Sequence, residues 1–129
     1  MNKSTVTLIG RLILGTIFLV MGLNGFLNFL PMPEISQAGM AYMGGLMSAV
    51  YFFPLLKIIE ITAGVMLLTG NYMRLALILL APITTHIVLF HFFLDPAGLV
   101  IGLVVFGLNL GLGLIHLDKF QSTLSKSWD

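Results

Sequence analysis

The chain has 129 residues, of which 58% are hydrophobic and 9% are charged. Soluble domains carry about 25% charged residues, so this chain lacks the polar groups to cover a water-facing surface, and we expect a polytopic membrane protein. Its net charge of +1 provides no basic patch for nucleic acid, and the absence of cysteine excludes disulfides, thiol nucleophiles and iron–sulfur ligation. The length suits a single membrane domain over residues 1–129.

Four apolar stretches are long enough to cross a bilayer as helices, which takes about 20 residues each. We expect spans over residues 5–30, 52–70, 74–94 and 97–117, then a short polar tail over residues 118–129. Pro31, Gly70 and Pro96 stand where these helices should end. The first run exceeds the apolar part of a signal peptide, about 7–15 residues, so we expect it to be retained. The predicted fold is an all-α, four-helix transmembrane bundle.

The segment between the first two spans, residues 34–53, is too polar and too rich in glycine for a further span. We expect a short helix there, either lying at the membrane interface or re-entrant against the bundle. The alternative is that this segment extends the second span outward.

Lysine and arginine are concentrated at one side of this topology, and cytoplasmic ends of spans carry such an excess. The basic residues on the side of the two termini are Lys3, Arg11, Arg74, Lys119 and Lys126. The opposite connections carry Glu34 and Asp95 and no basic residue. We therefore expect a multi-pass protein of the inner membrane with both termini in the cytoplasm.

Glu60 lies within the second apolar stretch. A charged carboxylate at membrane depth is unfavourable by several kcal/mol unless it is paired, so such residues are candidates for function. Lys57 lies one turn away on the same helix face and can form a structural ion pair with Glu60. Alternatively, its side chain extends to the lipid headgroups. Arg11 of the first span is another candidate partner, because its fork matches a carboxylate, although it can also extend to the cytoplasmic boundary.

Polar side chains from all four spans are predicted in the outer half of the bundle. Counting helical rise places Glu60 about 9–15 Å and His86 about 12 Å below the outer boundary. Asn109 comes out slightly deeper, and Asn24 lies near the outer end. We expect a small cavity, open toward the outer leaflet, lined by Glu60, Lys57, His86 and Asn24.

Each of these residues also has a structural explanation. His86 can be a packing histidine, and Asn24 and Asn109 can form hydrogen bonds between helices. Asp95 precedes Pro96 and is expected to cap the fourth helix.

Metal and haem sites are not expected. His86 and His91 are five residues apart, which separates them by about 140° around a helix. Small residues are expected to permit close helix packing. These are Gly15, Gly22 and Gly25 in the first span, and Gly98, Gly102, Gly107, Gly111 and Gly113 in the fourth. Gly107 and Gly111 have the spacing of a dimer motif, although packing within the chain explains them equally well.

The run from Arg11 to Phe26, with Gly15, Gly22, Asn24 and Gly25, resembles the opening helix of the DoxX family. In the second span the resemblance rests on Glu60, Gly64, Leu67, Leu68, Gly70 and Arg74. It implies a four-helix bundle of the inner membrane. Named members are linked to thiosulfate:quinone oxidoreduction and to redox-stress complexes, and related animal proteins act as receptor-assembly factors. Arg11 and Glu60 carry over, whereas the family's usual lysine near the end of the first helix is replaced by Asn24-Gly25.

We expect a protein that binds a quinone or another small lipophilic molecule as a subunit of a membrane redox system. Glu60 would accept or shuttle a proton, His86 would hydrogen-bond the ligand, and Arg11 or Lys57 would fix the charge state. Redox partner subunits and a homo-oligomer are compatible with this hypothesis, and whether the chain is an enzyme is left open. The alternative is a non-catalytic scaffold or assembly factor whose polar residues fix helix packing. A transporter is the third interpretation, since four helices can form a transport pathway only in an oligomer.

Overall fold

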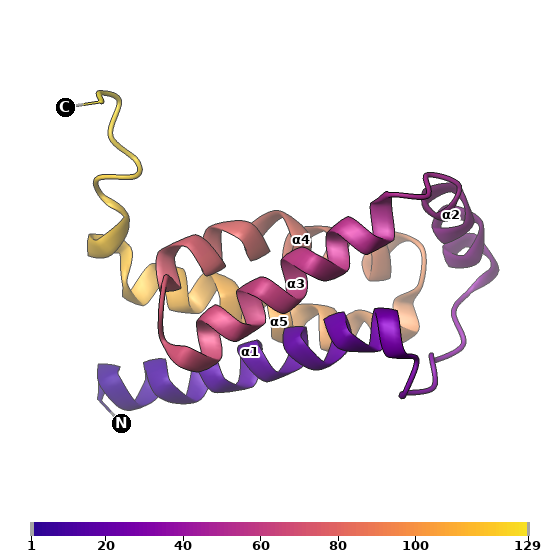
Figure 1. Cartoon of the computed structure of the whole chain (residues 1–129), viewed down its shortest axis with the longest axis horizontal. Coiled ribbons are helices and arrows are strands. Elements are labelled where there is room, and N and C mark those ends of the chain that lie inside the picture. Colours follow the sequence, from indigo (N-terminus) through magenta and orange to yellow (C-terminus); the bar gives the residue numbers. More distant parts are fainter. Residues whose placement is uncertain (1, 129) are drawn as a thin grey trace.

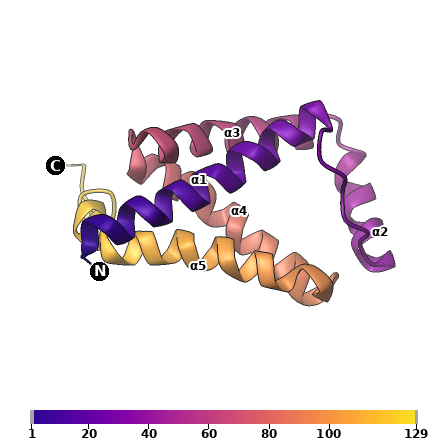
Figure 2. The same ribbon diagram turned by 90° about the horizontal axis from the view of Figure 1, so that it is seen from below.

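Two pairs of antiparallel helices make up the computed structural model, which describes residues 2–128. Helix α1 (Lys3–Leu27) packs on α3 (Phe52–Thr69), and α4 (Met73–Phe93) packs on α5 (Leu99–Ile115). Contacts between α3 and α4 and between α1 and α5 join the pairs (Figures 1 and 2). Four helices are long and apolar enough to cross a membrane, when the short η1 (Pro96–Gly98) is counted with α5. The predicted all-α bundle is confirmed.

The helices end where the backbone leaves the right-handed region. Helix α1 stops at Leu27, three residues before its predicted end, because Asn28 adopts a left-handed conformation with φ 51°. Helix α3 stops at Thr69 because Gly70 has φ 74°, which glycine adopts without a Cβ clash. The bounds of the other spans lie within two residues of those predicted.

The segment between α1 and α3 forms a separate helix, α2 (Gln37–Met47). A turn over residues 48–51 separates α2 from α3, so the alternative of an extended second span is wrong. Ser36 begins α2, because its Oγ accepts a hydrogen bond from Gly39 N at 3.0 Å. Figures 1 and 2 show α2 running across the end of the bundle opposite to the termini. This position confirms the predicted short helix between the first two spans.

The core lies along the bundle axis, where the inward faces of the four long helices meet. Its fully or almost fully buried members are Leu14, Phe18, Ala63, Leu67, Ala76, Leu77, Leu80, Val105 and Leu112. Most other large apolar side chains of these helices are exposed, as expected of surfaces that face lipid.

Helices α1 and α3 approach until their backbones touch. A Cβ on Gly64 would lie 2.7 Å from Leu19 N and 3.0 Å from the carbonyl oxygen of Gly15. A Cβ on Gly22 would lie 2.7 Å from Ile61 Cγ1. The predicted role of small residues in helix packing therefore holds for this pair.

The glycines of α5 do not all behave in the same way. Gly98 and Gly102 face His91 and Val88 of α4, whereas a Cβ on Gly107, Gly111 or Gly113 would meet nothing within 4 Å. For these three the expectation of packing within the chain is wrong. The reason is that α5 packs mainly on α4 and less on α1, which leaves part of its circumference without a neighbour.

Candidate functional site

Glu60 is buried and paired within its own helix. Only 4% of the residue is exposed. The Nζ of Lys57, one turn earlier, donates to Glu60 Oε2 at 3.1 Å. Among residues 2–128 this is the only ion pair that Glu60 makes. The carboxylate is therefore satisfied without a partner from another helix.

The stem of Lys57 crosses α1 at Gly25. A Cβ at position 25 would lie 2.6 Å from Lys57 Cγ, 2.7 Å from Cδ and 2.9 Å from Cε. Because Gly25 has no side chain, the space beside its backbone is filled by the stem of Lys57. Lys57 brings a cation from α3 to the end of α1, which itself carries Asn24 and Gly25 there.

Arg11 caps the C-terminal end of α3. Its Nη1 donates to the carbonyl oxygens of Leu67 at 2.8 Å and of Leu68 at 2.9 Å. Carbonyls in the last turn of a helix lack partners within it, and a cation there opposes the negative end of the helix dipole. The predicted pair between Arg11 and Glu60 is not formed. In antiparallel helices the beginning of α1 lies level with the end of α3, and Glu60 is about 10 Å further along.

His86 pairs with a tyrosine of α2. Its Nε2 lies 3.0 Å from the Tyr42 hydroxyl, and the two rings stack with centroids 5.6 Å apart. Phe90 packs against the same tyrosine at 6.0 Å. His86 is exposed on α4, whereas Glu60 is buried on α3. The residues of the predicted cavity are therefore divided between the inside of the bundle and its outer surface.

The two asparagines form hydrogen bonds within the chain. Asn109 Oδ1 accepts from Thr84 Oγ1 at 3.0 Å, and Asn109 Nδ2 donates to the Leu77 carbonyl at 3.2 Å. These bonds join α5 to α4 near Pro82, which removes one backbone donor from α4. Asn24 Oδ1 accepts from Leu30 N at 2.7 Å and so fixes the chain after α1. Thr84 is fully buried and was missed from the sequence, where a lone threonine in an apolar span gives no signal.

A family model described as DoxX matches residues 6–92, more than half of the chain. The chain belongs to the DoxX family. The match runs from α1 through most of α4, and it includes Arg11, Lys57, Glu60 and His86 but not Asn109. No curated protein and no solved structure matches this DoxX protein.

A second polar cluster of the DoxX protein lies at its α2 end. Asp95 is 5% exposed. Its Oδ1 accepts from Ser36 N at 3.0 Å, and its Oδ2 lies 3.4 Å from Nδ1 of His91. Ser36 Oγ in turn donates to the Leu94 carbonyl. Asp95 occupies the predicted N-cap position, just before η1 and α5, but its side chain makes no cap bond there. The carboxylate instead fixes Ser36, the residue before α2.

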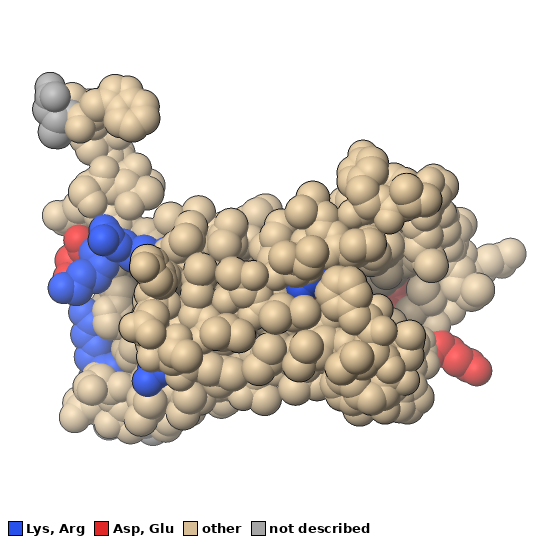
Figure 3. Space-filling view, viewed as in Figure 1, with Lys and Arg blue, Asp and Glu red and all other residues tan. Residues whose placement is uncertain are grey.

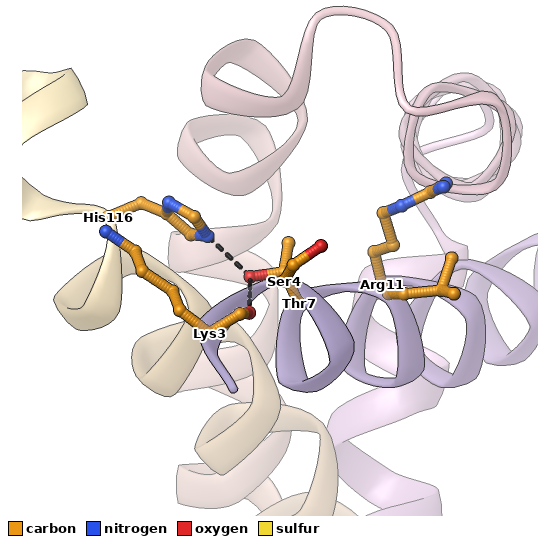
Figure 4. Close-up of a pocket in the computed structure, with 6 residues that line it drawn as sticks. Lys3, Ser4, Thr7, Arg11 and His116 are labelled. Carbon is orange, nitrogen blue, oxygen red and sulfur yellow. Dashed lines mark hydrogen bonds between the residues drawn. The ribbon is translucent and has the colours of Figure 1, made fainter. Parts of the chain in front are cut away.

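Two hollows of this DoxX protein lie at the other end of the bundle, near the termini. One is lined by Lys3, Ser4, Thr7, Leu8, Arg11 and His116 (Figure 4). The other is lined mainly by polar residues around Arg74 and Lys119. Of the ligand-binding residues predicted from the sequence, only Arg11 lines either hollow. Within residues 2–128 no three histidine, aspartate or glutamate side chains are grouped to hold a metal ion.

Proposed function

We propose that this DoxX family protein binds a quinone or another small lipophilic molecule, as a subunit of a membrane redox system. The observation that carries the proposal is the hydrogen-bonded pair of exposed His86 on α4 and half-buried Tyr42 on α2. Both groups are of the kind that hydrogen-bond a quinone carbonyl.

The pair retains one donor for a ligand in either tautomer. A neutral imidazole has one N–H, and a phenol has one O–H. The bond between His86 Nε2 and Tyr42 uses one of these hydrogens. If Tyr42 donates, the Nδ1–H of His86 remains; if His86 donates, the phenol hydrogen remains. Phe90 beside Tyr42 adds an aromatic surface on which a flat ring can stack.

In this proposal Glu60 and Lys57 do not contact the ligand. They hold α3 against α1, while Arg11 and the two asparagines fix helix ends and helix pairs. Of the predicted site residues, only His86 keeps its place beside the ligand, and either it or Tyr42 donates the hydrogen bond. A redox partner subunit would then reach the quinone from the surface formed by α2 and α4.

The test is the quinone content of protein purified in a mild detergent. His86→Leu and Tyr42→Phe are compared with wild type, and Tyr51→Phe is the matched control, since Tyr51 is an exposed tyrosine at the start of α3. We expect quinone in wild type and control, and a clear loss in both site variants with folding retained. Negligible quinone in all four proteins would count against a ligand site.

A non-catalytic scaffold or assembly factor is the second candidate, and one observation favours it. Every buried side-chain nitrogen or oxygen among residues 2–128 has a hydrogen-bond partner. No buried group inside the bundle is thus left waiting for a ligand. Under this alternative, loss of Tyr42 or His86 would change the yield of a partner complex and leave quinone content unaffected.

We further propose an inner-membrane location with both termini in the cytoplasm. Support comes from lysine and arginine gathered at the end of the bundle that carries the termini (Figure 3). Because the chain has no cysteine, single cysteines report accessibility without background. An impermeant maleimide added to intact cells should label Gly44→Cys in α2 and not Thr123→Cys in the tail. The reverse pattern would refute this orientation.

A further inference from the structure

The hollow near the termini is separate from the Tyr42 and His86 pair, at the opposite end of the bundle. It has a volume of about 560 Å³ and is lined by Lys3, Ser4, Thr7, Leu8, Arg11 and His116. Figure 4 shows Lys3 and His116 side by side at one end of it and Arg11 at the other. Most of its walls come from α1, and His116 follows directly on α5.

The hydrogen bonds around Thr7 fix which nitrogen of His116 carries hydrogen. The Thr7 hydroxyl has a single hydrogen and donates it to the Lys3 carbonyl at 2.7 Å. Nε2 of His116 lies 2.7 Å from the Thr7 hydroxyl oxygen, and it must therefore donate to that oxygen. This bond uses Nε2 and leaves Nδ1, on the other side of the ring, free.

The basic side chains of Lys3 and Arg11 have donors to spare. Lys3 lies 3.8 Å from Asp118, and both side chains are more than half exposed (55% and 58%). Such surface pairs contribute little, so the ammonium is free to exchange partners. Arg11 uses Nη1 for the two carbonyls of α3. A guanidinium has five N–H groups, which leaves those on Nε and Nη2.

The apolar surroundings specify what kind of anion fits. On α1, Leu8 lines the hollow and is 45% exposed, and Leu12, one turn further on, is 39% exposed. Because α1 is long and apolar enough to cross a membrane, we expect these side chains to face lipid. A ligand that satisfies both surfaces has a negative head and an acyl chain. A free inorganic anion would leave the apolar wall uncovered.

We propose that this hollow binds the phosphate of an anionic phospholipid. Lys3 and His116 contact the headgroup from the water side, and Arg11 contacts it from the bundle side. The Ser4 hydroxyl adds a further donor, and the acyl chains lie along α1 at Leu8 and Leu12. Because Arg11 also caps α3, the bound lipid touches the group that ties α1 to α3. The inference does not depend on the proposed quinone site.

The test is equilibrium binding of radiolabelled dioleoyl phosphatidylglycerol to full-length protein held on beads in a neutral detergent. A basic side chain near an anionic lipid is worth about 1 kcal/mol, so Lys3→Gln should weaken binding about fivefold. Adding His116→Phe should weaken it further. Lys126→Gln removes the same charge from the exposed tail and should leave binding unchanged.

Competition separates lipid from other sources of phosphate. Unlabelled phosphatidylglycerol should displace the label, whereas phosphatidylcholine should do so poorly and sodium phosphate should not at equal concentration. Equal displacement by phosphatidylcholine would overturn the requirement for an anionic lipid. Equal displacement by sodium phosphate would overturn the assignment to a lipid. An equal loss of binding in Lys126→Gln and Lys3→Gln would mean that only the net charge of the protein matters, and it would overturn the proposed site.

Discussion

The pairing of Glu60 with Lys57 leads to a prediction about stability. Replacing Lys57 by Met keeps most of the stem that lies across Gly25 and removes only the ammonium. Glu60 is then left buried, at 4% exposure, without its ionic partner. We expect Lys57→Met to destabilise the protein, and the double variant Lys57→Met, Glu60→Leu to recover most of the loss.

The size of the effect follows from the geometry. Removing one partner of a buried pair typically costs about 3–5 kcal/mol, whereas replacing both by apolar groups is close to neutral. The Lys57 side chain is 21% exposed, which places this pair at the lower end of that range. The loss of stability also has an upper limit, because the carboxylate of Glu60 can take up a proton and become neutral. Protonating a free glutamic acid takes about 3.7 kcal/mol at pH 7 and about 1 kcal/mol at pH 5. We therefore expect a loss of about 3 kcal/mol at pH 7 that shrinks at pH 5.

The measurement is the free energy of unfolding in mixed micelles, followed by pulse proteolysis at increasing fractions of denaturing detergent. Lys126→Met in the exposed tail is the matched control, and it should behave as wild type. A Lys57→Met variant as stable as wild type at pH 7 would refute the argument. So would a double variant no more stable than the single one, because the loss would then not come from an unpaired carboxylate.

Three further predictions use the same unfolding assay. Gly64→Ala should cost about 1–3 kcal/mol because its Cβ meets backbone atoms of α1, which cannot move aside. Gly44→Ala, with nothing within 4 Å, should not destabilise the protein, because alanine is favoured over glycine within a helix; an equal loss of stability in both variants would contradict the packing of α1 on α3. Arg11→Met should cost about 1.5–3 kcal/mol through the two carbonyls of α3 left without a donor, and Arg11→Lys should recover only part; full stability of Arg11→Met would exclude the capping role. Thr84→Val should cost about 0.6–1.7 kcal/mol by removing the bond to Asn109, and the loss should disappear when Asn109→Leu is already present.

The resemblance to the DoxX family could be recognised from spaced glycines and polar residues, because these are local features of the sequence. The burial of Glu60 could be predicted from the sequence, since a lone acid in an apolar stretch contrasts with its surroundings. The ion-pair partner of Glu60 could not be predicted, because the sequence contains two candidates. Lys57 has the right spacing within the helix, and Arg11 has a complementary charge on another helix. Spacing within a helix does not tell how two helices are aligned.

The amino-acid sequence by itself determined the four spans, the short helix between the first two of them and their class of fold. Hydropathy, proline and glycine act over a few residues, so they need no knowledge of the neighbours. Only the tertiary structure decided which polar groups meet. The antiparallel alignment of α1 and α3, set by Gly15, Gly22 and Gly64 in contact with the opposite helix, brings Arg11 to the end of α3 and runs Lys57 across Gly25. The chain's return at α2 places Tyr42 against His86 and Ser36 against Asp95, and these contacts join residues 44 and 59 positions apart.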